Sequence, residues 1–241
     1  MRHAVKKCCH LICVSQNTQS DLFKLFPQVD PAKTSVIYES AETKYSQFLK
    51  LPAAAQAKKK SVIKKQYGLN NFILAQGTRE PRKNLNRLID AFLKFKQKYP
   101  KTRVQLAITG KYGWGQDVTT KDPSIKILGF IPEKDMVGLH ASAICLAYPS
   151  LYEGFGLPVV KSLKVGVPVI TSHNSSLIEI SQGAAILVDP NSTESIAKAI
   201  EKIVHSKKLR QQLSRRGIEI AKKFSWQTAA KQTLMVYTSL C

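Results

Sequence analysis

Short, continuous apolar runs recur through the middle of the 241-residue chain. They lie at 72–76, 104–109, 125–128, 144–148, 168–171 and 185–188. Most of these runs have no polar interruption, which is typical of strands that are buried on both faces of a parallel sheet. Between several runs the apolar residues fall three and four positions apart, as on one face of a helix. This alternation predicts a doubly wound, Rossmann-like α/β fold.

Further apolar patterns predict the elements on both sides of this middle part. The predicted helices lie near 18–26, 53–66, 85–95, 158–165, 196–203, 209–224 and 226–240, and two more strands lie at 11–15 and 35–38. In a doubly wound sheet, ligands bind beyond the carboxyl ends of the strands, near the point where the strand order reverses. The loops that follow the predicted strands are therefore the places to search for a binding site.

Composition narrows the class of protein. Hydrophobic residues make up 44% of the chain, and no apolar run approaches the ~20 residues that span a bilayer. The early run Leu11–Val14 is too short for the core of a signal peptide, so we expect a soluble, cytoplasmic protein. Cys8, Cys9 and His10 have no second ligand pair at zinc spacing, so no metal site is predicted.

The net charge of +21 points to anionic partners. No acidic residue lies between Thr43 and Arg79, a stretch that contains many lysines. Such a surface attracts nucleic acid, anionic lipid headgroups or phosphorylated substrates; the alternative is a solvated face without a specific partner. Because no nucleic-acid-binding motif or aromatic stripe is present, no nucleic-acid partner is predicted. Peripheral contact with an anionic membrane surface is kept as an expectation.

The first informative strand end follows the run 72–76. Its loop reads Gly77-Thr78-Arg79-Glu80-Pro81-Arg82-Lys83-Asn84 and leads into a predicted helix. Glycine lets the backbone approach a ligand closely, and a helix N-terminus favours an anion. Arg82 and Lys83 add two cations that suit a diphosphate. The alternative is that both are surface residues in a first helical turn, where cations are mildly unfavourable.

The second informative strand end follows the run 144–148. Its loop contains Glu153-Gly154-Phe155-Gly156-Leu157-Pro158 and again opens a predicted helix. Two glycines before a helix form another cradle for an anion, although both also suit ordinary turns. Glu153 places a carboxylate where it would accept hydrogen bonds from sugar hydroxyls.

The other strand ends are less informative. After the run 125–128, Phe130 and Ile131 either flank a flat nucleobase or pack against the next helix, and the sequence does not decide between these. His173 has no evident carboxylate partner, and we interpret it as a loop residue rather than a general base. Glu179 is predicted to lie on a short helix after Ser176.

Through these motifs the sequence resembles the C-terminal domain of glycosyltransferase family 4, whose enzymes have the GT-B fold. The matching segments are ICVSQNTQSDL at 12–22, GTREPRKNL at 77–85, EGFGLP at 153–158, SSLIEI at 175–180 and VDP at 188–190. The resemblance covers nearly the whole chain, with the motifs in the same order. The form of the motif at 77–85 is most similar to bacterial mannosyl- or rhamnosyltransferases of surface polysaccharide synthesis.

The resemblance implies that a hexose passes from a GDP-, UDP- or ADP-linked sugar to a glycan or lipid-linked acceptor, with the anomeric configuration retained. It implies no metal or other cofactor, so Arg82 and Lys83 would stabilise the departing nucleoside diphosphate. Glu153 would contact the donor sugar, which makes these three the expected catalytic residues. The remaining expected substrate-binding residues are Gly77, Thr78, Phe130, Ile131, Gly154, Phe155, Gly156, Leu157 and Lys161.

Lys161 is a departure from the family pattern. The family has a second glutamate eight positions after the first, which grips the ribose hydroxyls, and here that position is Lys161. An ammonium has no lone pair with which to accept from a diol. The loss would cost ~1.5–3 kcal/mol, or about tenfold to a hundredfold in affinity. Lys161 would instead reach a phosphate or pair with Glu153.

The second departure concerns the domain organisation. Residues 1–40 are expected to be the end of an N-terminal domain and the interdomain crossover, residues 41–225 the nucleotide-sugar-binding domain, and residues 226–241 a C-terminal crossover helix. An acceptor-binding half would then come from a separate polypeptide, or the chain would be a fragment of a longer enzyme, and the isolated chain would be inactive. The alternative function is a catalytically inactive nucleotide-sugar-binding module or truncated pseudoenzyme.

Overall fold

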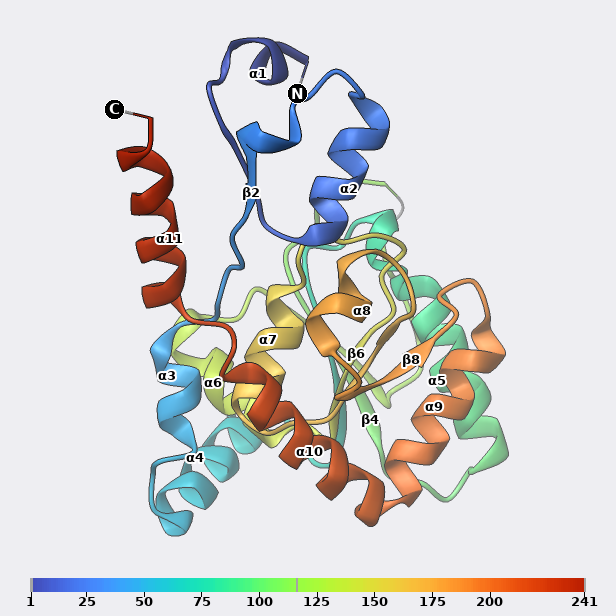
Figure 1. Cartoon of the computed structure of the whole chain (residues 1–241). Helices are drawn as coiled ribbons and strands as arrows, with labels where there is room; N and C mark the ends of the chain where they lie inside the picture. The colour runs from blue at the N-terminus through green and yellow to red at the C-terminus, as the bar shows by residue number, and fades with distance from the viewer. Residues whose placement is uncertain (1, 116, 241) are drawn as a thin grey trace.

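The computed structural model describes residues 2–115 and 117–240 and is built around one parallel sheet (Figure 1). Its six strands are β3 (Phe72–Gln76), β4 (Gln105–Thr109), β5 (Ile125–Gly129), β6 (Cys145–Tyr148), β7 (Val169–Ser172) and β8 (Ala185–Val188). In space they follow the order β5-β4-β3-β6-β7-β8. Each of the six apolar runs forms one of these strands, so the predicted doubly wound, Rossmann-like sheet is confirmed.

Both faces of the four central strands, β4, β3, β6 and β7, are buried, which explains their apolar runs. On β3, Phe72 and Leu74 join one hydrophobic core, while Ile73 and Ala75 join the other. The helices on the first side are α3 (Thr43–Phe48), α4 (Ala53–Gln66), α6 (Glu133–Ser142), α7 (Leu157–Lys164) and α8 (Ser175–Ser181). Those on the second side are α5 (Leu85–Lys98) and α9 (Thr193–His205).

The strand order reverses between β3 and β6. From β3 the chain proceeds outward through β4 to β5, and it then returns to β6 and proceeds the other way to β8. The carboxyl ends of β3 and β6 are therefore neighbours at the position where doubly wound sheets bind ligands. The two loops singled out from the sequence, after 72–76 and 144–148, follow these two strands.

The two ends of the chain form a second, smaller unit. It contains α1 (Arg2–Lys7), β1 (Leu11–Cys13), α2 (Gln16–Leu25), the 3-10 turn η1 (Pro31–Lys33) and β2 (Thr34–Val36), with β1 parallel to β2. Helix α10 (Lys207–Ala221) packs on α7 and α9, and α11 (Trp226–Thr238) then projects along β2 (Figure 1). None of the helices in residues 2–115 and 117–240 is long and apolar enough to cross a membrane.

Two chain segments connect this unit to the main sheet. The Ser40 hydroxyl lies between them and donates a hydrogen bond to the carbonyl of Phe224 at 2.9 Å. The domain boundaries at residues 40 and 225 stay predictions, and Ser40 and Phe224 lie at these two segments. The outermost residues of the predicted end segments, Met1 and Cys241, lie outside the described residues.

Candidate functional site

Arg82 and Lys83 meet Glu153 at the carboxyl ends of β3 and β6. The Lys83 ammonium lies 2.6 Å from Glu153 Oε1 and 2.6 Å from the Tyr148 hydroxyl. Arg82 Nη1 lies 2.8 Å from Glu153 Oε2, and Arg82 Nε lies 2.9 Å from Glu80 Oε2. These five residues are here called the Lys83 cluster. The structure thus brings together the three residues expected to be catalytic.

Burial differs strongly within the Lys83 cluster. The side chains of Lys83 and Glu153 are each 8% exposed, whereas that of Arg82 is 43% exposed. Burial alone would raise the pKa of Glu153, but the charge and hydrogen bond of Lys83 outweigh it and lower that pKa. Burial and the nearby Glu153 carboxylate raise the pKa of Tyr148 well above its usual value. Glu153 is therefore ionised at neutral pH, and Arg82 is the cation that faces solvent.

The backbone before α5 differs from the prediction. Residues Pro81–Lys83 form a separate 3-10 turn, η2, and Asn84 follows with a left-handed φ of 60°. Arg82 and Lys83 therefore precede α5 and do not lie in its first turn, so that alternative is wrong. The Asn84 amide holds the turn, because its Nδ2 donates to the carbonyls of Pro149 at 2.9 Å and Pro190 at 2.7 Å.

Two glycines allow the loops after β3 and β4 to approach closely. A Cβ atom on Gly110 would lie 1.8 Å from the Gly77 carbonyl oxygen, a distance at which the backbone must move. Gly77 itself has a φ of 143° and lies against the Lys83 side chain. Gly77 therefore allows close packing against the Lys83 side chain. Thr78, the next residue, is exposed to solvent.

The loop 153–157 is held by serine and threonine hydroxyls. The Gly154 carbonyl accepts from Ser15 Oγ at 2.7 Å and from Thr18 Oγ1 at 3.0 Å. Ser176 Oγ contacts the carbonyls of Glu153 at 2.9 Å and Phe155 at 2.7 Å. This loop therefore connects the small unit containing α2 to the main sheet.

Within that loop the predicted residues divide into backbone and core roles. Gly156 has a φ of 114° at the start of α7, a conformation that favours glycine. Leu157 is half-buried in the first turn of α7. The Phe155 ring is 4% exposed and packs against Tyr38 and Phe224, with centroid separations of 6.2 and 5.8 Å. Phe155 is accordingly a core side chain, and only its backbone lies in the loop.

Lys161 does not pair with Glu153. Its ammonium lies 3.5 Å from Glu133 Oε1 and 3.7 Å from Glu42 Oε1, and it sits 5.2 Å from the centre of the Tyr45 ring. Lys44 also pairs with Glu133, at 3.0 Å. These five residues are here called the Lys161 cluster.

The Lys161 cluster places two carboxylates, Glu42 and Glu133, beside the lysine at position 161. Burial opposes ionisation of Glu133, but Lys44 and Lys161 outweigh it and lower its pKa. Beneath the cluster, His140 is fully buried, with its ring nitrogens 2.8 Å from Ser162 Oγ and 2.5 Å from Gln76 Oε1. His140 thereby links the end of β3 to α7.

Phe130 and Ile131 have separate environments. Ile131 is 6% exposed and belongs to the core, which favours the packing alternative for this residue. Phe130 is 63% exposed, and the Lys111 ammonium lies 4.8 Å from its ring centre. His173 Nδ1 donates to the Val188 carbonyl at 2.7 Å. This contact agrees with its interpretation as a loop residue.

Several residues that shape the site were not predicted. Tyr148 and His140 belong to none of the motifs, and Asn84 stands in the motif at 77–85 without an assigned role. Tyr148 could have been found as the last residue of the fourth apolar run. Glu179 does lie on the predicted short helix, α8, and its carboxylate accepts from the backbone amides of Gln16 and Asn17 at the start of α2.

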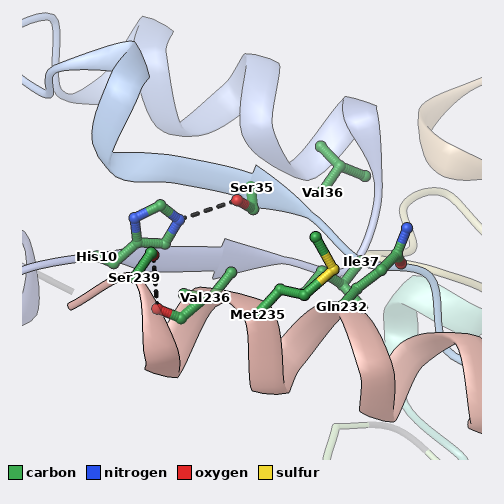
Figure 2. Close-up of a pocket in the computed structure, with 8 residues that line it drawn as sticks. All are labelled: His10, Ser35, Val36, Ile37, Gln232, Met235, Val236 and Ser239. Atoms are coloured by element: carbon green, nitrogen blue, oxygen red, sulfur yellow. Dashed lines mark hydrogen bonds between the residues drawn. The ribbon is translucent and has the colours of Figure 1, made fainter. Parts of the chain in front are cut away.

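A separate cavity of about 460 Å³ lies between α11 and the two short strands. Figure 2 shows Met235 and Gln232 of α11 beside Ile37, and His10 hydrogen-bonded to Ser35 at 2.9 Å. This cavity contains none of the expected site residues. It lies between β2 and α11, and no residue of the Lys83 cluster lines it.

The chain has clear relatives among known proteins. It is 35% identical to O-antigen chain mannosyltransferase B of Escherichia coli, over 73% of this chain and 48% of that protein. It is 28% identical to O-antigen chain mannosyltransferase RfbU of Salmonella typhimurium, over 84% of this chain and 53% of that protein. The chain therefore spans about half the length of these two relatives.

Solved structures show the same fold. Anabaena HepE, crystallised with UDP-glucose, matches with a TM-score of 0.84 and 21% identity, over 99% of this chain and 66% of that one. The lipopolysaccharide glycosyltransferase WaaG matches with a TM-score of 0.76 and 15% identity, over 93% of this chain and 62% of that one. The family profile described as glycosyl transferases group 1 matches residues 56–220. The chain belongs to the group 1 glycosyl transferases and has the fold of the C-terminal, Rossmann-like half of a GT-B enzyme.

Proposed function

We propose that this chain is the donor-binding half of a retaining glycosyltransferase, which transfers a hexose from a nucleotide-sugar to a glycan or lipid-linked acceptor. The observation that carries the proposal is the Lys83 cluster at the strand-order reversal, where two cations share one buried carboxylate. Breaking the bond between the sugar and the diphosphate leaves negative charge on the leaving group. Cations fixed in advance at that place stabilise the charge as it develops.

The three residues would divide this work. Arg82, whose side chain is 43% exposed, would meet the diphosphate from solvent, and Lys83 would approach it from the buried side. Glu153 would hold both cations in position before the donor arrives and contact the donor sugar. The exposed Phe130 ring would lie against the base. No metal is needed in this scheme, so activity is expected to persist in the presence of a chelator.

The relatives favour surface polysaccharide synthesis as the setting. Two of them are named as O-antigen chain mannosyltransferases, which supports mannose as the hexose and a growing polysaccharide as the acceptor. The HepE structure instead contains UDP-glucose. We therefore propose the nucleoside diphosphate as the recognised group and leave its base to experiment.

We also propose that a second, acceptor-binding half completes the enzyme. Strands β1 and β2 have three residues each and pair only with one another among the described strands. Parallel sheets of this size are rarely stable alone. Helix α11 beside them has Ala229 as its one buried residue in the described chain, while Leu234, Met235 and Tyr237 are each more than 60% exposed. A Rossmann-like half that extends this sheet would cover that surface.

The test is calorimetric titration of the chain with UDP-, GDP- and ADP-sugars. We expect one of them to bind, and Arg82→Gln to weaken its binding about tenfold or more, because a charge-assisted hydrogen bond to phosphate is lost. Lys94→Gln on α5 removes the same charge at a distant place and should leave the affinity unchanged. The proposal fails if no nucleotide-sugar binds, or if the two variants behave alike.

The second candidate function is a nucleotide-sugar-binding module without turnover. The observation that favours it is Lys161, because the position where the family has a glutamate carries an ammonium held by Glu42 and Glu133. Both candidate functions predict that a nucleotide-sugar binds, but only the first predicts that the sugar is transferred. Incubation with the acceptor half and a radiolabelled donor separates the two, because only the enzyme forms labelled product.

A further inference from the structure

Helices α4 and α6 form a groove on the outside of the molecule, away from the Lys83 cluster. Its rim consists of Lys58 and Lys59 from α4 and Lys134 from α6, and Val62 and Val137 lie between them. The enclosed volume is about 410 Å³. These five residues are here called the α4–α6 groove.

Close helix packing gives the groove an apolar floor. A Cβ atom on Gly138 would lie 2.6 Å from Ile63 Cγ1, so only glycine lets α6 approach α4 this closely. Ile63 is consequently buried, whereas its neighbour Val62 is 53% exposed. Lys58, Lys59 and Lys134 are all exposed around this valine. An exposed apolar side chain surrounded by lysines has both features needed to bind an anionic amphiphile.

The lysines of the groove have no internal counter-charge among the described residues. None of Lys58, Lys59 and Lys134 forms an ion pair there. Asp135 also lines the groove, but it is 9% exposed and accepts from Gln66 Nε2 at 2.9 Å and from the Tyr67 hydroxyl at 2.6 Å. Its carboxylate is therefore turned inward and engaged by two donors. The positive charges of Lys58, Lys59 and Lys134 are therefore available to an anionic partner outside the chain.

Lysines on the opposite side of the sheet behave differently. On α5 and α9, Lys94 and Lys198 pair with Glu194, and Lys98 pairs with Glu201. Helices α5 and α9 together carry five lysines, the same number as α4 alone, and three of these five have a carboxylate partner. The imbalance at the groove is thus a local feature of the structure and does not follow from the net charge alone.

We propose that the α4–α6 groove docks this protein on a membrane that contains anionic phospholipid. The lipid phosphate would lie against Lys58, Lys59 and Lys134, and the glycerol and upper acyl carbons would contact Val62 and Val137. Nucleic acid fits the groove less well, because none of its five residues is an aromatic ring on which a base would stack. Free phosphate has no apolar part that would contact the exposed Val62 side chain. Docking is independent of sugar transfer and is measured without a donor.

The test is co-sedimentation with phosphatidylcholine vesicles prepared with and without phosphatidylglycerol. We expect binding only to vesicles that contain phosphatidylglycerol, with affinity that falls at high salt. The combined variant Lys58→Gln, Lys59→Gln and Lys134→Gln should bind about a hundredfold more weakly, at about fivefold per lysine. The matched control, Lys94→Gln with Lys98→Gln and Lys198→Gln, has the same net charge and should bind like the unmodified chain.

A further variant tests the apolar part of the groove. Val62→Gln replaces the exposed valine with an uncharged polar side chain and keeps every lysine, so the lost apolar contact alone should weaken binding to the anionic vesicles by about tenfold. Thermal melting checks that each variant remains folded. Equal losses in the two triple variants would overturn the groove as the docking site, because net charge alone would then explain binding. Lysine-dependent binding of a short single-stranded oligonucleotide without vesicle binding would also overturn it.

Discussion

The Lys83 cluster and the Lys161 cluster contain the same kinds of groups but differ in how deeply the charges are buried and how closely they pair. Each has two cations, two carboxylates and one tyrosine. In the first, Lys83 and Glu153 are each 8% exposed and 2.6 Å apart. In the second, Lys161 is 13% exposed, but its partners Glu42 and Glu133 are 45% and 51% exposed and lie 3.5 Å or more away.

This difference in burial separates the roles that the two clusters can have. Buried charges interact strongly and lose much when a partner is removed, whereas half-exposed pairs are screened by water and salt. The Lys83 cluster is therefore a fixed arrangement of cations, suited to charge that appears during a reaction. In the Lys161 cluster the carboxylates are half-exposed, so its ion pairs are the weaker ones.

Glu153→Gln should have the largest effect on stability. It leaves the Lys83 ammonium buried beside a neutral amide, and breaking a buried ion pair from one side costs about 3–5 kcal/mol. Urea denaturation of the variant and the unmodified chain measures this change in the free energy of unfolding. Adding Lys83→Met should restore part of the loss, because the unpaired charge is removed as well. A loss below about 1 kcal/mol would contradict the buried pair.

Acidification should distinguish the two clusters by pH. His140 lies under the Lys161 cluster, and its pKa is lowered from 6.5 to about 3, mainly by burial. His140 is therefore protonated at a lower pH in the folded protein than in the unfolded chain. Its contribution to stability is therefore present above pH 6.5 and is lost as the pH falls from 6.5 towards 3, by ~1.4 kcal/mol per pH unit. The lowered pKa of Glu153 adds a loss only below its ordinary value of 4.5.

The measurement is the melting temperature between pH 7 and pH 4, for the unmodified chain and for His140→Gln. The variant should show a flatter profile between pH 6.5 and 4.5, because a side chain without that titration no longer couples folding to protons. Glu153→Gln should keep the slope in this window and lose only the part below pH 4.5. Parallel profiles for all three proteins would rule out these assignments.

The Lys83 cluster was largely predictable from the sequence. Its two loops follow uninterrupted apolar runs, and parallel strands bring their carboxyl ends to one edge of the sheet. What the sequence did not show is the backbone between them. The 3-10 turn at Pro81–Lys83 and the left-handed Asn84 depend on carbonyls of Pro149 and Pro190, which are remote in the chain.

The Lys161 cluster was not predictable in the same way. Position 161 was recognised as a departure, but its partners come from the connecting segment before α3 and from the start of α6. Neither Glu42 nor Glu133 belongs to a motif, and their approach follows from how α3, α6 and α7 pack. Periodicity predicts which face of a helix is buried, but it does not predict which charges meet across three helices.

Lys161→Gln should have the smallest effect on stability. Its two carboxylate partners are about half exposed, so the loss should be no more than about 1 kcal/mol and should shrink further at high salt. Urea denaturation at two salt concentrations measures it. A loss comparable to that of Glu153→Gln would remove the distinction between the clusters.

The same position also tests where the donor ribose lies. Lys161→Glu alone would put a third carboxylate beside Glu42 and Glu133, so we combine it with Glu133→Gln, which keeps the number of carboxylates at two. If position 161 faces the ribose, the restored carboxylate should tighten nucleotide-sugar binding about tenfold or more, because it accepts from the diol. Calorimetry on this double variant and on Glu133→Gln alone isolates the contribution of position 161. Equal affinities would place the ribose elsewhere and leave the Lys161 cluster with a purely structural role.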